Sequence, residues 1–251
     1  MTILQFAILG LIQGLTEFLP VSSSGHLVLF GSIFGTSETL FVSILLHVAT
    51  LCSILVVMRK EVLYLLKNPF SKEARKLYIS TIATFIVVLL IYNFAKNAYV
   101  EKYLPFFFIS TAVILLISEL FSKKRKNREL SLKQALIIGV AQGFAIFPGL
   151  SRSGTTISVG MFVGGDRESV SKFSFLLSIP IILASMFMET IELVNSKVMV
   201  SQNMFGLIIG FLVSFTVGII SLKIMIKATS KIGFRYFAIY LIILSIILLI
   251  I

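Results

Sequence analysis

Charged residues are scarce in this sequence: 13% of its 251 residues are Asp, Glu, Lys or Arg, whereas 57% are hydrophobic. A soluble core of a chain this size could not enclose so much apolar surface, so the composition excludes an ordinary soluble domain. Acidic residues are the rarer sign, 11 against 22 basic ones. The one cysteine, Cys52, excludes an intramolecular disulfide and a cysteine-based metal cluster.

Long apolar runs instead indicate an all-α integral membrane protein. A helix needs about 20 residues to cross about 30 Å of hydrocarbon, and six runs approach that length. We therefore predict six full transmembrane helices, over residues 40–58, 77–95, 104–121, 173–188, 204–222 and 234–251.

The basic residues gather in connections between these predicted spans. Residues 59–76, 123–133 and 223–235 hold 6, 6 and 4 of the 22 Lys and Arg residues. They do not form an amphipathic face with interleaved aromatics, so no nucleic-acid partner is expected. The positive-inside rule places the three connections in the cytoplasm, which puts both termini outside.

An internal repeat links the two halves of the chain. Residues 5–26 align without a gap with residues 134–155, and nine positions, mostly Gln, Gly and Ser, are identical. Chance matches between apolar segments would favour Leu and Ile, so we interpret the match as a duplication. Repeat one is predicted over residues 1–122 and repeat two over 133–251, within a single membrane domain of residues 1–251. Three predicted spans separate the copies, so the second copy enters the membrane from the opposite face, as in inverted-topology repeats.

Each copy begins with an apolar segment of about 14 residues, too short to cross a membrane, followed by Pro and a Ser/Gly cluster. This pattern predicts two re-entrant helical hairpins, over residues 3–35 and 134–163, each followed by three spans. Non-helical backbone at membrane depth must be buried in protein or face a wet cavity. We therefore expect the two hairpin tips to meet near the midplane and to form the functional site.

The first tip carries an amide, a carboxylate, hydroxyls and an imidazole. In a helix, Gln13 and Glu17 would lie on one face, and their oxygens suit Mg²⁺ or Ca²⁺. Ser23 and His26 are three residues apart, which allows a serine nucleophile with a histidine base, or histidine as the nucleophile. The alternative role for the serines is helix capping. His47, alone in an apolar span, is interpreted as a core histidine.

The second tip places Arg152 among hydroxyls and glycines at an expected helix start. A guanidinium beside exposed amides binds phosphate in a bidentate fashion, and an ion pair with Glu17 is the alternative. Together the tips hold the groups that phosphoryl transfer needs. The sequence contains no P-loop, so we expect the bound phosphate to belong to a lipid rather than to a nucleotide.

The sequence resembles, over essentially its whole length, the bacterial undecaprenyl-diphosphate phosphatases, also described as bacitracin-resistance proteins. Two signatures carry the resemblance: [E/Q]xxxE followed by PVSSSGH at residues 13–26, and PGxSRSxxT at residues 148–156. The resemblance implies hydrolysis of undecaprenyl diphosphate to undecaprenyl phosphate and inorganic phosphate, which recycles the lipid carrier for cell-wall synthesis. It also implies a divalent cation, Mg²⁺ or Ca²⁺, and a bacterial plasma membrane with the active site open to the outer face.

By motif position, the resemblance implies roles for single residues. Glu17 and Arg152 would be catalytic, Ser23 and His26 would be the nucleophile and base candidates, and Glu17 with Gln13 would hold the metal. Phosphate contacts would come from Arg152 and from the hydroxyls of Ser22, Ser151, Ser153 and Thr156. Residues 173–180 are expected to pack around the site.

The expected partners are a polyprenyl diphosphate lipid, the surrounding membrane lipid and, as a candidate, a second copy of the chain. The alternative function is a lipid or small-molecule transporter or flippase, because inverted repeats with broken helices are also a transporter design.

Overall fold

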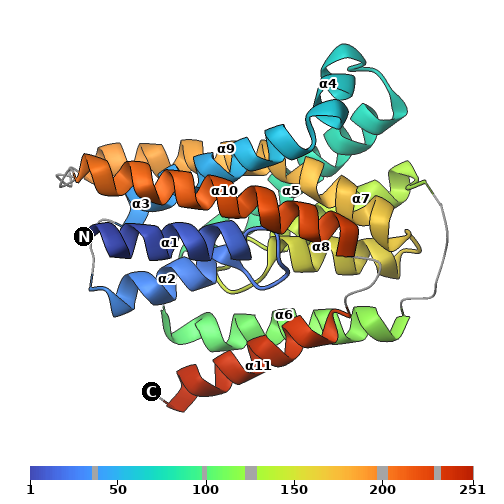
Figure 1. Cartoon of the computed structure of the whole chain (residues 1–251). Helices are drawn as coiled ribbons and strands as arrows, with labels where there is room; N and C mark the ends of the chain where they lie inside the picture. Colours follow the sequence, from blue (N-terminus) through green and yellow to red (C-terminus); the bar gives the residue numbers. More distant parts are fainter. Residues whose placement is uncertain (36–38, 98–100, 122–128, 197–202, 229–232, 251) are drawn as a thin grey trace.

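The computed structural model describes residues 1–35, 39–97, 101–121, 129–196, 203–228 and 233–250, and within these ranges the regular structure is entirely helical (Figure 1). The predicted all-α class is confirmed. The basic residues at 123–128, Lys231 and the last residue of the predicted final span lie outside the described residues. In chain order the elements are α1 (Ile3–Thr16), α2 (Ser23–Ile33), α3 (Thr39–Val57), α4 (Arg59–Lys67), α5 (Lys72–Asn97), η1 (Glu101–Tyr103), α6 (Leu104–Phe121), α7 (Leu132–Phe144), α8 (Arg152–Phe162), α9 (Arg167–Ser196), α10 (Met204–Ala228) and α11 (Arg235–Ile250).

Within the described residues, four helices, α3, α5, α9 and α10, are long and apolar enough to cross a membrane, which supports the predicted membrane character of the chain. The other two predicted spans correspond to α6 and α11, apolar helices of 18 and 16 residues. Whether α6 and α11 also cross stays a prediction. Helix α9 is longer than predicted, 30 residues, because polar helix-forming residues extend it beyond the apolar run at both ends.

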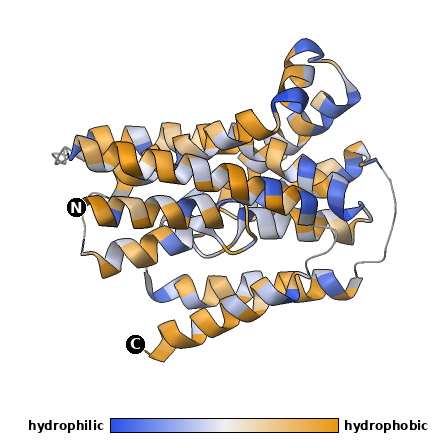
Figure 2. Cartoon of the chain, in the orientation of Figure 1, coloured by the Kyte–Doolittle hydropathy of each residue, from blue (hydrophilic) through white to orange (hydrophobic). Residues whose placement is uncertain are grey.

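The predicted connection over residues 59–76 contains a helix of its own. Helix α4 begins directly after α3, and α5 already begins at Lys72, so few residues of this segment lie outside a helix. The many charged residues of this segment are typical of a loop. Its apolar residues, however, recur at helical spacing between the basic ones. In Figure 1, α4 projects from the rest of the bundle, and Figure 2 shows hydrophilic residues gathered at this end of the molecule.

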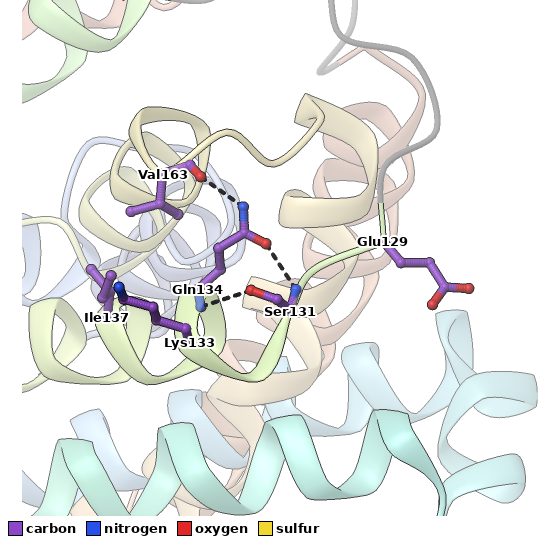
Figure 3. Close-up of a pocket in the computed structure, with 6 residues that line it drawn as sticks. All are labelled: Glu129, Ser131, Lys133, Gln134, Ile137 and Val163. Atoms are coloured by element: carbon purple, nitrogen blue, oxygen red, sulfur yellow. Dashed lines mark hydrogen bonds between the residues drawn. The ribbon is translucent and has the colours of Figure 1, made fainter.

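The two segments that match in sequence begin in the same way. At the start of α1, the backbone N–H of Gln5 donates to Thr2 Oγ1 (3.3 Å), and the backbone N–H of Thr2 donates to Gln5 Oε1 (2.8 Å). Ser131 and Gln134 form the same capping box at the start of α7 (Figure 3). Gln134 Nε2 also donates to the Val163 carbonyl at 2.6 Å, which ties the start of α7 to the end of α8.

Both segments also break and restart in the same way. The chain leaves the helix after α1 and after α7, and α2 and α8 then begin behind the N-cap residues Ser22 and Ser151. Their hydroxyls accept hydrogen bonds from Gly25 N at 3.4 Å and Gly154 N at 3.1 Å. The predicted helix–break–helix pattern is therefore present in both segments. The repeat boundaries and the position of these hairpins in a membrane stay predictions.

Each hairpin packs its first helix against a helix from the other half of the chain: α1 lies on α10, and α7 lies on α5. These contacts are close, because a Cβ at Gly10 would collide with the backbone of Gly210, and one at Gly139 with the backbone of Ser80. On the second pair, Thr84 Oγ1 donates to the Gly139 carbonyl at 2.8 Å. Each half of the chain therefore contributes a helix that packs against the hairpin of the other half, and both breaks lie inside the bundle.

Gly149, in the second break, has a φ of +93°, and a Cβ there would lie 2.8 Å from Phe107 Cβ. We predict that Gly149→Ala lowers the thermal unfolding midpoint in detergent, because positive φ costs an L-residue about 1–2 kcal/mol and the contact adds to it. Gly35→Ala is the control: φ is +60° there, but no described atom lies within 4 Å of the added Cβ. Equal midpoints for the two variants would contradict this account of the break.

Candidate active site

The two breaks are bonded to each other through backbone and hydroxyl groups. Gly149 N donates to Ser22 Oγ at 3.0 Å, and Ser153 Oγ donates to the Leu19 carbonyl at 3.0 Å. Thr111 of α6 accepts from Ser151 N (3.0 Å) and donates to the Gly149 carbonyl (2.9 Å). Backbone groups that leave the helices thereby find partners inside the protein. The expectation that the two tips meet is confirmed.

Glu17, at the end of α1, is the centre of the polar cluster and is only 5% exposed. Its Oε2 atom accepts hydrogen bonds from Ser23 Oγ at 2.5 Å and from Gln13 Nε2 at 3.0 Å. Its Oε1 atom accepts from a guanidinium nitrogen of Arg152, and His47 Nε2 lies 3.9 Å from Oε2. The i, i+4 contact predicted for Gln13 and Glu17 is present, with the amide nitrogen toward the carboxylate.

Arg152, the first residue of α8, forms the ion pair with Glu17 that the sequence analysis considered as an alternative to phosphate binding. Its second terminal nitrogen, Nη1, is buried and has no hydrogen-bond partner among the described residues. A buried donor left unpaired is costly and rare in native proteins. The guanidinium therefore retains a donor for an anion while it holds the carboxylate.

The cluster lines a cavity of about 1170 Å³. Glu17, Ser23, His47 and Arg152 all line it. Apolar side chains of α5 and α9 line it as well, including Val88, Leu89, Ile181, Ile182, Phe187 and Met188, and α9 adds two carboxylates, Glu189 and Glu192. A cavity that combines charged and hydroxyl groups with a large apolar lining fits an amphiphile with an anionic head.

His26 faces away from this cavity. Its ring is buried and stacks on Tyr240, with centroids 5.8 Å apart. Nδ1 lies 2.7 Å from the Ser22 carbonyl oxygen and Nε2 lies 2.7 Å from the Tyr240 hydroxyl, so both ring nitrogens are engaged. The structure brings Ser23 to Glu17 and does not bring it to His26.

His47 was interpreted as a core histidine, and that interpretation is wrong, because its ring lines the cavity beside Glu17. Its Nδ1 lies 2.8 Å from the Ser43 carbonyl oxygen, which leaves Nε2 facing the carboxylate. Glu189 of α9 also lines the cavity and was missed. The available signal was the same for both: an ionisable side chain at or next to a predicted span.

The remaining predicted phosphate contacts divide into two groups. Thr156 does not line the cavity: its hydroxyl lies 2.8 Å from the Arg152 carbonyl and 2.6 Å from Ser174 Oγ, and it joins α8 to α9. Ser174 belongs to the segment 173–180 that was expected to pack around the site. Three hydroxyl residues do line the cavity: Ser22, Ser151 and Ser153.

For a divalent cation, the described residues offer an incomplete set of ligands. Among them, no three His, Cys, Asp or Glu side chains gather as a metal site. Gln13 Oε1, however, is buried beside the Glu17 carboxylate and has no hydrogen-bond partner within the described ranges. An amide oxygen and a carboxylate are ligands that Mg²⁺ and Ca²⁺ prefer, and both ions commonly complete their shells with water or phosphate oxygens. The two residues fit such an ion as a partial shell.

Known proteins resemble the chain along nearly its whole length. The family described as "Bacitracin resistance protein BacA" matches residues 6–247, and the chain belongs to this family. A relative from Thermosipho africanus named undecaprenyl-diphosphatase is 40% identical and is matched over 96% of each chain. Relatives of the same name from Bacteroides thetaiotaomicron and Carboxydothermus hydrogenoformans are each 38% identical, over 96% and 98% of this chain and 95% and 96% of their own.

Because Glu17 and Arg152 are both largely buried, we predict that losing one partner is strongly destabilising. Arg152→Ala should cost about 3–5 kcal/mol of folding free energy, since it leaves a buried carboxylate unpaired. The double variant Glu17→Gln with Arg152→Gln should recover part of this loss. Thermal unfolding in detergent would measure both.

The control is Lys172→Ala, which breaks an exposed pair with Glu168 (2.7 Å). Such surface pairs contribute about 0–1 kcal/mol. The ion-pair account fails if Arg152→Ala unfolds at the same temperature as Lys172→Ala.

Proposed function

We propose that this protein is a membrane-embedded phosphatase that hydrolyses undecaprenyl diphosphate to undecaprenyl phosphate and inorganic phosphate, recycling the lipid carrier for cell-wall synthesis. The observation that carries the proposal is the cavity in which Glu17, Ser23 and Arg152 meet at the end of an apolar wall. The relatives that match nearly the whole chain are named for this activity.

The substrate would lie with its diphosphate at the polar end and its prenyl chain along α5 and α9. Arg152 Nη1, which has no hydrogen-bond partner among the described residues, would donate to the terminal phosphate. The hydroxyls of Ser22, Ser151 and Ser153 line the same end and would contribute further contacts. Leu89 and Phe187 line the cavity and are 77% and 67% exposed, so the chain of a long lipid could lie against them and continue into the bilayer.

Of the two nucleophile candidates, the contacts favour Ser23. Its hydroxyl donates to Glu17 at 2.5 Å, so the carboxylate is in place to accept the proton as Ser23 Oγ attacks the terminal phosphorus. The bond from phosphorus to the bridging oxygen breaks, and undecaprenyl phosphate leaves with the electron pair. Water then attacks the phosphoserine, inorganic phosphate is released and Ser23 regains its proton.

Arg152 would stabilise the charge on the transferred phosphoryl group. Phosphate and Glu17 compete for this guanidinium, so binding of the substrate would loosen the ion pair and free the carboxylate to act as a base. A divalent cation held by Gln13 and Glu17 would neutralise charge on the phosphate oxygens.

We further propose that six helices cross the plasma membrane and that α1/α2 and α7/α8 are re-entrant hairpins. The helices of the hairpins have 14, 11, 13 and 11 residues, too few to cross alone. The cavity is lined near the start of α3, by Leu40 and Val42, whereas the basic helix α4 follows the other end of α3. With basic segments inside, the cavity would open to the outer face.

We predict that Arg152→Lys, which keeps the positive charge, lowers phosphate release from undecaprenyl diphosphate at least tenfold. The reason is that a lysine ammonium lacks the planar fork of N–H donors with which a guanidinium binds a phosphate in a bidentate fashion. Glu17→Ala and Arg152→Ala should abolish release in purified protein that remains folded. The assay uses added Mg²⁺ or Ca²⁺ and a parallel sample with chelator. Wild-type rates in these variants would remove Arg152 and Glu17 from the mechanism, and a wild-type protein that releases no phosphate would favour the transporter alternative.

For the nucleophile, we predict that Ser23→Ala abolishes turnover and the trapped phosphoenzyme together. The matched control is Ser24→Ala, which removes a neighbouring hydroxyl 3.4 Å from Ser22 Oγ and should retain both. Substrate labelled on the terminal phosphate is used, the reaction is quenched with denaturing detergent at mildly alkaline pH, where both phosphoserine and phosphohistidine survive, and peptide mapping locates the phosphoryl group. A phosphoenzyme that persists in Ser23→Ala, or that maps to His26, would contradict the assignment.

A further inference from the structure

Helix α4 is amphipathic and projects from the bundle (Figure 1). One side is anchored, because Val62 is partly buried against the main hydrophobic core. The next apolar positions are not covered: Leu63 is 52% exposed, Leu66 is 72% exposed and Phe70, just after the helix, is 88% exposed. Single exposed apolar residues are normal in proteins. Three large exposed apolar residues between positions 63 and 70, however, form an apolar surface that favours contact with lipid or protein.

The same segment is strongly basic. Residues 59–76 contain six Lys and Arg and two Glu, a net charge of +4 (6 − 2). Lys60 and Lys67 are exposed. They are two turns apart on one face of the helix, on the side away from Val62. An apolar stripe beside a basic stripe is the pattern of helices that lie in the headgroup region of a bilayer.

The position of α4 in the chain brings it to such a region. It is joined directly to α3 and, through a short turn, to α5, and both of these helices are long and apolar enough to cross a membrane. A helix between the ends of two crossing helices lies at the boundary between hydrocarbon and water. Helix α4 projects from the bundle (Figure 2), and Leu63, Leu66 and Phe70 are not covered by the described part of the chain.

We propose that α4 is an interfacial helix that binds anionic lipid headgroups, with Leu63, Leu66 and Phe70 at the acyl boundary and Lys60 and Lys67 at the phosphates. Basic residues near a membrane surface are attracted by anionic lipid, and the attraction decays within a Debye length. A second copy of the chain is the weaker candidate for this surface, because a symmetric contact would bring two segments of charge +4 together.

The chain contains no tryptophan, so one introduced tryptophan reports on a single position. We suggest Leu66→Trp in the full chain, reconstituted into vesicles of zwitterionic lipid alone or with added phosphatidylglycerol. Its emission would be recorded with and without lipids brominated near the headgroup end of the acyl chain. The control reporter is Leu90→Trp on α5, which is 79% exposed, lies within a candidate span and does not line the cavity.

The expected result is that phosphatidylglycerol shifts the Leu66→Trp emission to shorter wavelength and increases its quenching by brominated lipid. Raising the salt from about 0.1 M to about 1 M, which shortens the Debye length from about 10 to about 3 Å, should reverse most of this change. Adding Lys60→Gln and Lys67→Gln should remove it, and Leu90→Trp should be quenched equally in both lipids.

Two results would overturn the proposal. One is a water-like Leu66→Trp emission, insensitive to brominated lipid, in both kinds of vesicle. The other is an emission shift that follows the ratio of protein to lipid and not the lipid charge, which would assign the surface to a second copy of the chain.

Discussion

A buried ion pair joins Glu17 and Arg152 across 135 positions of sequence, and the arrangement of the site depends on it. Neither charge would be tolerated alone at this depth, because desolvating a single ion costs several kcal/mol. The pair therefore requires both helical breaks to be present and in contact. The same contact brings Ser23 to the carboxylate and leaves one guanidinium nitrogen without a hydrogen-bond partner in the described part of the chain. The interaction that holds the two halves together therefore also assembles the reactive groups.

The breaks remain stable because hydroxyls and glycines replace the missing helical hydrogen bonds. Ser22 is an example: its side chain caps α2 and at the same time accepts a bond from Gly149 of the other break. Gly149 supplies a conformation that other residues reach only with strain. These residues explain why Ser and Gly dominate the repeated motif, since they serve the backbone as well as the proposed substrate.

Much of the fold could be predicted from the sequence because its signals are physical ones. Apolar runs located the long helices, and the repeated Ser/Gly clusters located both breaks. The contact between Glu17 and Arg152 was also predictable, since each is an ionisable residue that needs a partner at membrane depth. Helix α4 was not predicted, because its basic residues are typical of a loop between spans and its helical spacing of apolar residues extends over only nine residues.

The directions of individual side chains could not be predicted. His26 and His47 are an example: spacing along a helix places His26 near Ser23, but its ring turns to Tyr240, on a helix more than 200 residues later. His47 seemed isolated in sequence and reaches the site only because α3 packs beside α1. The direction of each ring depends on tertiary contacts between distant segments, and local sequence patterns do not predict these contacts.

The central claim is that Arg152 binds the substrate phosphate in competition with Glu17. The most direct test is the affinity of undecaprenyl diphosphate, in the presence of chelator, for wild-type protein, Glu17→Gln and Arg152→Gln. The account predicts that Glu17→Gln binds at least as tightly as wild type although it does not turn over, and that Arg152→Gln binds at least tenfold more weakly, about 1.4 kcal/mol. Wild-type affinity in Arg152→Gln would contradict it.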